Sequence, residues 1–356
     1  MTSTKDTYRP STGQPVVTRF FRLCAICITC TSLLSAQALA DTVTIYSSRE
    51  GELIEPILQQ FSDRTGVEIN YIHGKADSLI SQMVEEGESS QADLLLTSDV
   101  GTLIAAADAG ILQSVYSPVL ATQIPSRYRD PDNIWYGLTI RARVLIFASD
   151  HPDSDTLTGY EDLADPRWKG RVCMRSSGSV YNRSLVAALI ERWGEEITTA
   201  WAKGVTANLA HPPQGGDRDQ IYAVAAGECD LTIANHYYYV MMLGSEDDRE
   251  RAAAEKSAIL WPNQADDGTH INISGGGVAK HAPNRADAIR LLEYLISTPV
   301  QLSLSQTITE YPMIQGIPVS NTLAGLGSFN ADSVNLGELA THDRAVIRIF
   351  TEAGWK

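Results

Sequence analysis

The sequence predicts an α/β protein of two lobes, each built on a mostly parallel sheet flanked by helices. Segments of strand and helix character alternate along residues 42–107 and again along residues 171–234. This alternation is typical of a parallel sheet with helices on both faces. A long extended segment, residues 137–149, follows the first of these alternating sets, and another, residues 270–280, follows the second. Strands of this length can cross between two lobes, which would close around a ligand by a hinge motion.

The first α/β set begins directly after residue 41. Strands are predicted at short apolar runs, and helices where apolar residues recur three or four positions apart. The predicted strands are residues 42–46, 67–72 and 92–96, and the predicted helices contain the apolar positions of residues 53–61, 79–84 and 103–107.

The second set follows the first extended segment. Its predicted strands are residues 171–174 and 229–234, and its predicted helices are residues 185–193, 197–205 and 220–226. Three consecutive glycines, Gly275 to Gly277, lie in the second extended segment. A helix over residues 286–296 is predicted next, and a looser tail from Gly316 ends in a helix around Ala345.

Composition excludes several classes of protein. The 356 residues include 28 Lys+Arg and 43 Asp+Glu, a formal net charge of −15, and 44 % of them are apolar. This composition is too apolar for a disordered chain. The acidic balance argues against a nucleic-acid partner, because phosphate binding depends on an excess of Lys and Arg.

The first forty residues have the features of a secretory signal. Arg19 and Arg22 precede a short apolar run, and Ala38-Leu39-Ala40 has the small residues of a cleavage site. A membrane anchor is the alternative, but the apolar run is too short to span a bilayer. We therefore expect residues 1–40 to be a signal peptide, cleaved after Ala40, and the mature protein to be exported.

Two cysteines remain in the expected mature chain, Cys173 and Cys229. In an exported protein, two cysteines most simply form one disulfide. A metal pair is the alternative, but it needs further ligands of that type. Each cysteine lies in a predicted strand shortly before a tyrosine segment, so the disulfide would brace the lobe that carries these tyrosines.

A run of tyrosines, Tyr237 to Tyr239, follows the apolar strand that ends at Ala234. Side chains at the carboxyl end of a strand point into the crevice where α/β proteins bind ligands. A turn from strand to helix would let adjacent phenols converge there. The alternative is an aromatic cluster that packs in the core.

Seven segments resemble, in order, the ferric-iron-binding proteins of bacterial ABC importers, which are periplasmic relatives of transferrin. The resemblance covers nearly the whole mature chain and implies the two-lobed type II periplasmic-binding-protein fold. It implies one lobe from residues 41–138 and 272–315 and another from residues 139–271 and 316–356. The seven segments are Ile45–Arg49, Ala92–Thr97, Asp108–Leu112, Trp168–Gly170, Ser179–Asn182, Asn235–Tyr238 and Glu310–Pro312.

The resemblance also implies the metal ligands. Tyr237 and Tyr238 match the tandem tyrosine ligands of the family, and Tyr181 matches the third tyrosine of its tyrosine-rich branch. Fe³⁺ is a hard ion that prefers oxygen donors to thiolate. Because the ion binds phenolate, it must displace the phenol protons. Three phenolates would neutralise its three charges.

Arginines match the family's site for a synergistic anion such as carbonate. Arg141 is the first candidate, Arg143 the second and Arg49 a further one. Arginine binds planar oxyanions with two parallel hydrogen bonds, and residues two apart on a strand face the same side. The alternative is that one of these arginines forms only a salt bridge.

The first predicted lobe departs from some relatives. Glu50 replaces a histidine ligand of one branch, so it is either a metal ligand or an exposed glutamate at a helix start. Asp99 lies near that branch's glutamate ligand, and we expect it to cap a helix. His236 matches a variable position of the family, so we expect it beside the site or at the surface.

The predicted function is capture of Fe³⁺ with its anion in the cleft between the lobes and delivery to an inner-membrane ABC permease, by a monomer. We predict that the protein is not an enzyme, since no nucleophile motif occurs. An alternative keeps the fold but changes the solute to an organic anion, a thiamine-like compound or a polyamine. Paired tyrosines could flank such a cation or stack on a ring.

Overall fold

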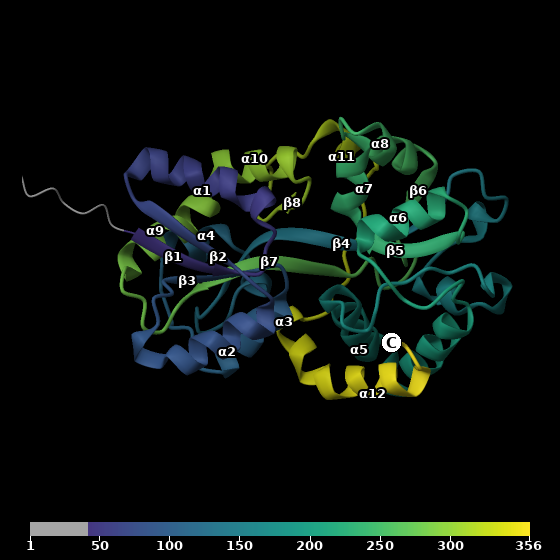
Figure 1. Cartoon of the computed structure of the whole chain (residues 1–356), viewed down its shortest axis with the longest axis horizontal. Helices are drawn as coiled ribbons and strands as arrows, with labels where there is room; N and C mark the ends of the chain where they lie inside the picture. Colours follow the sequence, from purple (N-terminus) through teal and green to yellow (C-terminus); the bar gives the residue numbers. More distant parts are fainter. Residues whose placement is uncertain (1–41) are drawn as a thin grey trace, which may run out of the picture. The chain divides into compact units, whose positions relative to one another are not determined.

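The computed structural model describes residues 42–356 (Figure 1). The predicted signal peptide and its cleavage site lie outside these residues. Residues 42–356 belong to one compact unit, so the predicted division into lobes stays a prediction. No helix within residues 42–356 is both long and apolar enough to cross a membrane.

The first α/β set forms as predicted. Its strands pair in the order β2-β1-β3, and both of these pairings are parallel. The strands carry buried apolar side chains such as those of Ile45 and Leu95, and helices pack their apolar faces against the sheet. The elements are β1 (Thr42–Ser47), α1 (Gly51–Thr65), β2 (Glu68–His73), α2 (Ala76–Glu86), β3 (Leu94–Thr97) and α3 (Val100–Asp108).

The two long extended segments are strands that run side by side (Figure 1). They are β4 (Tyr136–Ala148) and β7 (Ile271–Val278), and they pair antiparallel. The far end of β4 pairs with β5 (Leu231–Asn235) and β6 (Ser257–Leu260), again antiparallel. Strand β4 therefore belongs to both halves of the sheet, as a crossover strand must.

The pairing around β4 corrects the expectation of two mostly parallel sheets. A strand that leaves one half and a strand that returns to it run in opposite directions, so β4 and β7 cannot be parallel. The predicted strand 171–174 is reduced to two isolated parallel bridges, which Val172 forms with Leu209 and with Leu231.

The remaining helices follow the predicted order. The helices predicted over residues 185–193 and 197–205 are joined in α5 (Val180–Ala207), which is interrupted at Gly194, where φ is 80°. A positive φ is readily adopted only by glycine. Helix α12 packs along α5 (Figure 1). The other elements are α4 (Pro118–Gln123), α6 (Asp217–Ala225), α7 (His236–Leu243), α8 (Asp248–Glu255), α9 (Arg285–Leu295), α10 (Thr298–Thr307), β8 (Tyr311–Pro312), α11 (Asn321–Gly325) and α12 (Asp343–Ala353).

The three glycines of β7 let neighbouring chain segments approach closely. A Cβ at Gly275 would lie 2.5 Å from the carbonyl oxygen of Tyr136, and one at Gly277 would lie 2.8 Å from that of Ile134. Side-chain-bearing residues cannot accept such contacts with backbone. The triple glycine is thus explained by packing between strands rather than by phosphate binding.

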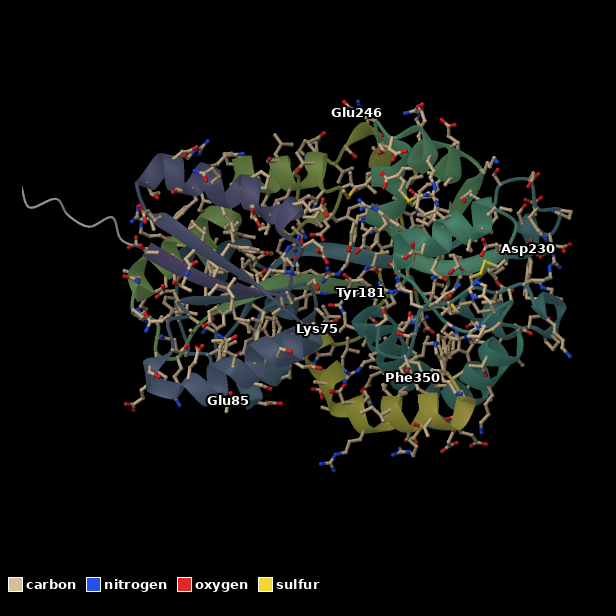
Figure 2. The ribbon with its side chains drawn as sticks, in the orientation of Figure 1. Lys75, Glu85, Tyr181, Asp230, Glu246 and Phe350 are labelled. Atoms are coloured by element: carbon tan, nitrogen blue, oxygen red, sulfur yellow. A yellow bond between two sulfur atoms is a disulfide. The ribbon has the colours of Figure 1, made fainter. Side chains whose placement is uncertain are left out.

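Cys173 and Cys229 form a disulfide (Figure 2). Their Cα atoms lie 5.8 Å apart and are 56 residues apart in sequence. Both side chains are buried, so the bond joins the segment before α5 to the segment before β5 inside the protein.

Removing this disulfide is expected to destabilise the mature protein. A crosslink over a loop of this length restricts the unfolded chain, and we expect the double variant Cys173→Ala/Cys229→Ala to lose about 3 kcal/mol. Urea unfolding followed by circular dichroism would measure the loss. Two free thiols in the native, untreated protein would contradict the prediction.

Candidate metal centre

Three tyrosines converge from the first turns of two helices. Helix α7 begins where β5 ends and carries Tyr237 and Tyr238, while Tyr181 lies in the first turn of α5. The hydroxyl oxygens of Tyr181 and Tyr237 are 3.4 Å apart, and the rings of Tyr237 and Tyr238 are 4.2 Å apart. Tyr181 lies near the middle of the view in Figure 2. Helix N-termini favour negative charge, so both helices favour phenolates here.

Two of the phenols, those of Tyr237 and Tyr238, resist ionisation. Tyr237 is only 2 % exposed. Burial, and then the neighbouring Tyr181 and Tyr238, raise the pKa of Tyr237 well above its ordinary value. Burial also raises the pKa of Tyr238, and Tyr181 adds to this shift. Tyr237 and Tyr238 therefore stay neutral at physiological pH unless a cation takes the place of their protons.

Arg141 is a buried guanidinium with unused donors. It is 2 % exposed, and its Nε and Nη2 atoms have no hydrogen-bond partner among the described residues. The guanidinium carbon lies 5.5 Å from the centre of the Tyr181 ring. Unpaired buried donors are unfavourable, so this arginine is suited to an added acceptor such as an anion.

Arg143 is engaged in other contacts. Its Nη1 lies 2.6 Å from Asp217 Oδ2, and its Nη2 donates to Asn182 Oδ1 at 2.9 Å. Arg175 binds the other oxygen of Asp217 at 2.9 Å. Burial alone would raise the pKa of Asp217, but Arg143 and Arg175 hold it below its ordinary value. Arg143 therefore matches the salt-bridge alternative better than anion binding.

Arg49 also has a protein partner. Its Nη2 donates to Glu310 Oε2 at 3.1 Å, and Glu310 Oε1 lies 3.7 Å from Arg141 Nη1. Thr139 donates to the same carboxylate. Glu310 belongs to a segment that resembles the iron-binding family, but no role was predicted for it. Its partners lie far away in sequence, so no local pattern indicates them.

A small cavity of about 10 Å³ lies beside Arg141, Arg143 and Tyr181. This volume holds about one water molecule. His270 and Ser184 also line it, with 3.0 Å between His270 Nε2 and Ser184 Oγ. Asp332 Oδ2 lies 3.1 Å from His270 Nδ1. No sequence pattern predicted this series of hydrogen bonds, which holds Ser184 in place beside the cavity that Tyr181 also lines.

Glu50 and Asp99, the two acidic candidates of the first predicted lobe, both lie at helix starts. Glu50 is exposed at the start of α1, which agrees with the second of its two interpretations. Asp99 caps α3, with Oδ1 accepting from the Thr102 backbone at 3.2 Å, as predicted. Among the described residues, no group of three or more His, Cys, Asp or Glu side chains could hold a metal ion. The predicted ligands remain the phenols of Tyr181, Tyr237 and Tyr238.

His236 is fully buried, which excludes the surface position considered for it. Its Nδ1 accepts from the Ala142 backbone at 3.0 Å, and its Nε2 donates to the Thr309 carbonyl at the same distance. Burial lowers its pKa to about 4, so the ring is neutral at physiological pH. The ring also packs edge-on against Tyr237, with centroids 6.0 Å apart. His236 thus supports the ligand segment.

The fold and this site define a two-lobed binding protein of the type II periplasmic class. The chain belongs to the family of bacterial extracellular solute-binding proteins, whose model matches residues 89–324. It is 45 % identical to iron uptake protein A1 of Synechocystis sp. over 324 residues, which cover 89 % of this chain and 90 % of that protein.

Two solved structures resemble the chain over nearly their whole length. A Trichodesmium protein in complex with iron and citrate has a TM-score of 0.83 and 41 % identity, covering 88 % of this chain and 100 % of that one. The apo ferric ion-binding protein A of Pasteurella haemolytica has a TM-score of 0.85 and 41 % identity, covering 89 % and 98 %.

Proposed function

We propose that this protein captures Fe³⁺ in the periplasm and delivers it to an inner-membrane ABC permease. The observation that carries the proposal is the convergence of three phenols, from Tyr181, Tyr237 and Tyr238, at two helix N-termini. Oxygen donors of this kind suit a hard trivalent ion. The names of the similar proteins, which refer to iron uptake and ferric ion binding, agree with this chemistry.

The charges around the phenols support the same ligand. Three phenolates neutralise Fe³⁺, and the burial of Tyr237 means that a strongly charged cation must drive its deprotonation. Arg141 then offers its unpaired Nε and Nη2 atoms to a small anion such as carbonate on the same metal. No chemical conversion is required of the site. The protein would act as a monomer whose predicted lobes close around the ion.

Metal analysis and the visible spectrum of the mature protein test this function. We expect about one Fe³⁺ per chain and a red-orange phenolate-to-iron absorption band after loading with ferric ion and bicarbonate. Chelation of the iron should remove the colour reversibly. A colourless protein that takes up no Fe³⁺ with carbonate present would overturn the proposal.

A further inference from the structure

Glu310 is a buried carboxylate that lies between the arginines of the site. It is 2 % exposed, and neither metal ligation nor anion binding accounts for its position. Arg49 and Thr139 both donate to it, so its position is well determined. Burial alone would raise the pKa of Glu310, but Arg49 and Arg141 lower it, so the group is an anion.

Arg141 is held less firmly than Glu310. Its Nη1 lies 3.7 Å from Glu310 Oε1, which is an ion pair but longer than a hydrogen bond. Its guanidinium carbon also lies 5.5 Å from the centre of the Tyr181 ring. Arg141 is therefore close both to a permanent carboxylate and to a phenol that would become negative when a metal displaces its proton.

The segment that carries Glu310 is fixed to the ligand helix. The Thr309 carbonyl accepts from His236, and the Thr309 hydroxyl donates to the Tyr237 carbonyl at 3.2 Å. Thr309 also has a φ of 55°, which is uncommon for a residue other than glycine. With the carboxylate held in this way, the group that can change partners is Arg141.

We propose that Glu310 is the resident counter-anion of Arg141 and competes for it with the phenolates and the bound anion. The inference rests on the proposed function. An interaction that is stronger in the empty site than in the loaded one opposes loading. This competition weakens iron binding, so Glu310 is a positioning residue that favours release.

The variant Glu310→Gln tests this role. It removes the charge and keeps the shape, and we expect iron loss to citrate to become about ten-fold slower, the size of one close charge interaction. The decay of the visible band after mixing with citrate gives the rate. Glu310→Asp keeps the charge and should release iron at close to the wild-type rate.

Two further variants separate the charge of Glu310 from a general change in stability. Glu86→Gln changes a hydrogen-bonded glutamate that accepts from Tyr46 at 2.8 Å, away from the tyrosine ligands, and should leave the rate unchanged. If Glu310→Gln folds poorly, the charge-neutral double variant Arg49→Met/Glu310→Gln replaces it, and slower release is again expected. Release as fast as wild type in a folded variant without Glu310 would overturn the inference.

A measurement without iron separates this inference from the proposed function. We expect bicarbonate to bind iron-free Glu310→Gln about ten-fold more tightly than wild type by calorimetry, because Arg141 loses its competing anion. If wild type takes up no Fe³⁺ but the two proteins still differ in bicarbonate affinity, the proposed iron-binding function is wrong and the competition of Glu310 for Arg141 is supported. If iron binds and neither the release rate nor bicarbonate binding changes, only the role of Glu310 fails.

Discussion

Tyr237→Phe and Tyr238→Phe are each expected to lower iron affinity by more than about a hundred-fold. Loss of a residue that only supports a metal ligand typically reduces metal affinity by about 10- to 100-fold, and loss of the ligand itself should cost more. Each change removes one anionic oxygen donor and leaves the ring in place. The site would then hold two phenolates for three metal charges. Most of the visible absorption band should be lost, as measured by titration with ferric ion and bicarbonate.

Tyr239→Phe provides a matched control on the same helix. The Tyr239 hydroxyl donates to the Ser257 carbonyl at 3.0 Å, and its ring packs in the core. The loss of one hydrogen bond should reduce stability by about 1 kcal/mol and leave iron binding intact. Wild-type iron affinity in both ligand variants would contradict the tyrosine site and favour a solute that stacks on the rings.

The tyrosine segments could be predicted because their positions are determined locally. An apolar strand that ends at Ala234 and continues into a helix places Tyr237 and Tyr238 at the sheet edge, whatever the rest of the chain does. The long strand β4 and the pairing of two cysteines follow from similarly simple patterns. The resemblance to a known family then indicated what the phenols bind.

The charge partners of the arginines could not be predicted. Glu310 is 261 residues from Arg49, and Asp217 is 74 residues from Arg143. Such pairs depend on which elements meet in three dimensions, and a lone glutamate or aspartate in the sequence gives no sign of it. The strand position of Arg143 does not indicate its partner, so the sequence alone could not distinguish anion binding from a salt bridge for this residue.

The burial of His236 could not be predicted for a related reason. A polar residue at a strand-to-helix junction is usually exposed, and the sequence offers no acceptor nearby. In the fold, the carbonyl of Thr309, from a distant segment, accepts a hydrogen bond from the His236 ring, so the ring has a polar partner in the interior. Burial of a polar group depends on partners of this kind, which only the tertiary fold reveals.

Asp217→Asn is expected to destabilise the protein by about 4 kcal/mol, the usual effect of breaking a buried charge pair. The Asp217 carboxylate is fully buried. It accepts from Arg143, Arg175 and the backbone N–H of Asn235 at 2.6, 2.9 and 2.7 Å. Asparagine keeps the shape but leaves both guanidinium groups without a counter-charge. Urea unfolding of the iron-free protein at neutral pH measures the difference.

Asp248→Asn is the matched control at the surface. The Asp248 side chain is 91 % exposed and forms an ion pair with Arg251 within one helix. Exposed pairs of this kind contribute about 0.5 kcal/mol or less, so this variant should unfold nearly as wild type does. An equal loss of stability in Asp217→Asn and Asp248→Asn would mean that burial of the ion pair does not determine its contribution to stability.

The pH dependence of the Asp217→Asn effect follows from the lowered pKa of Asp217. A carboxyl group with a lower pKa in the folded state stabilises that state above its ordinary pKa, which is 3.8 here. This stabilisation is lost as the pH falls through the folded-state pKa, because the group then takes up a proton in both states. The difference in unfolding free energy between wild type and variant should therefore be largest at neutral pH and should shrink in acid below pH 3.8. A gap that widens with acid would mean that Asp217 is held in the folded protein as a neutral group, with its pKa raised by burial rather than lowered by the two arginines.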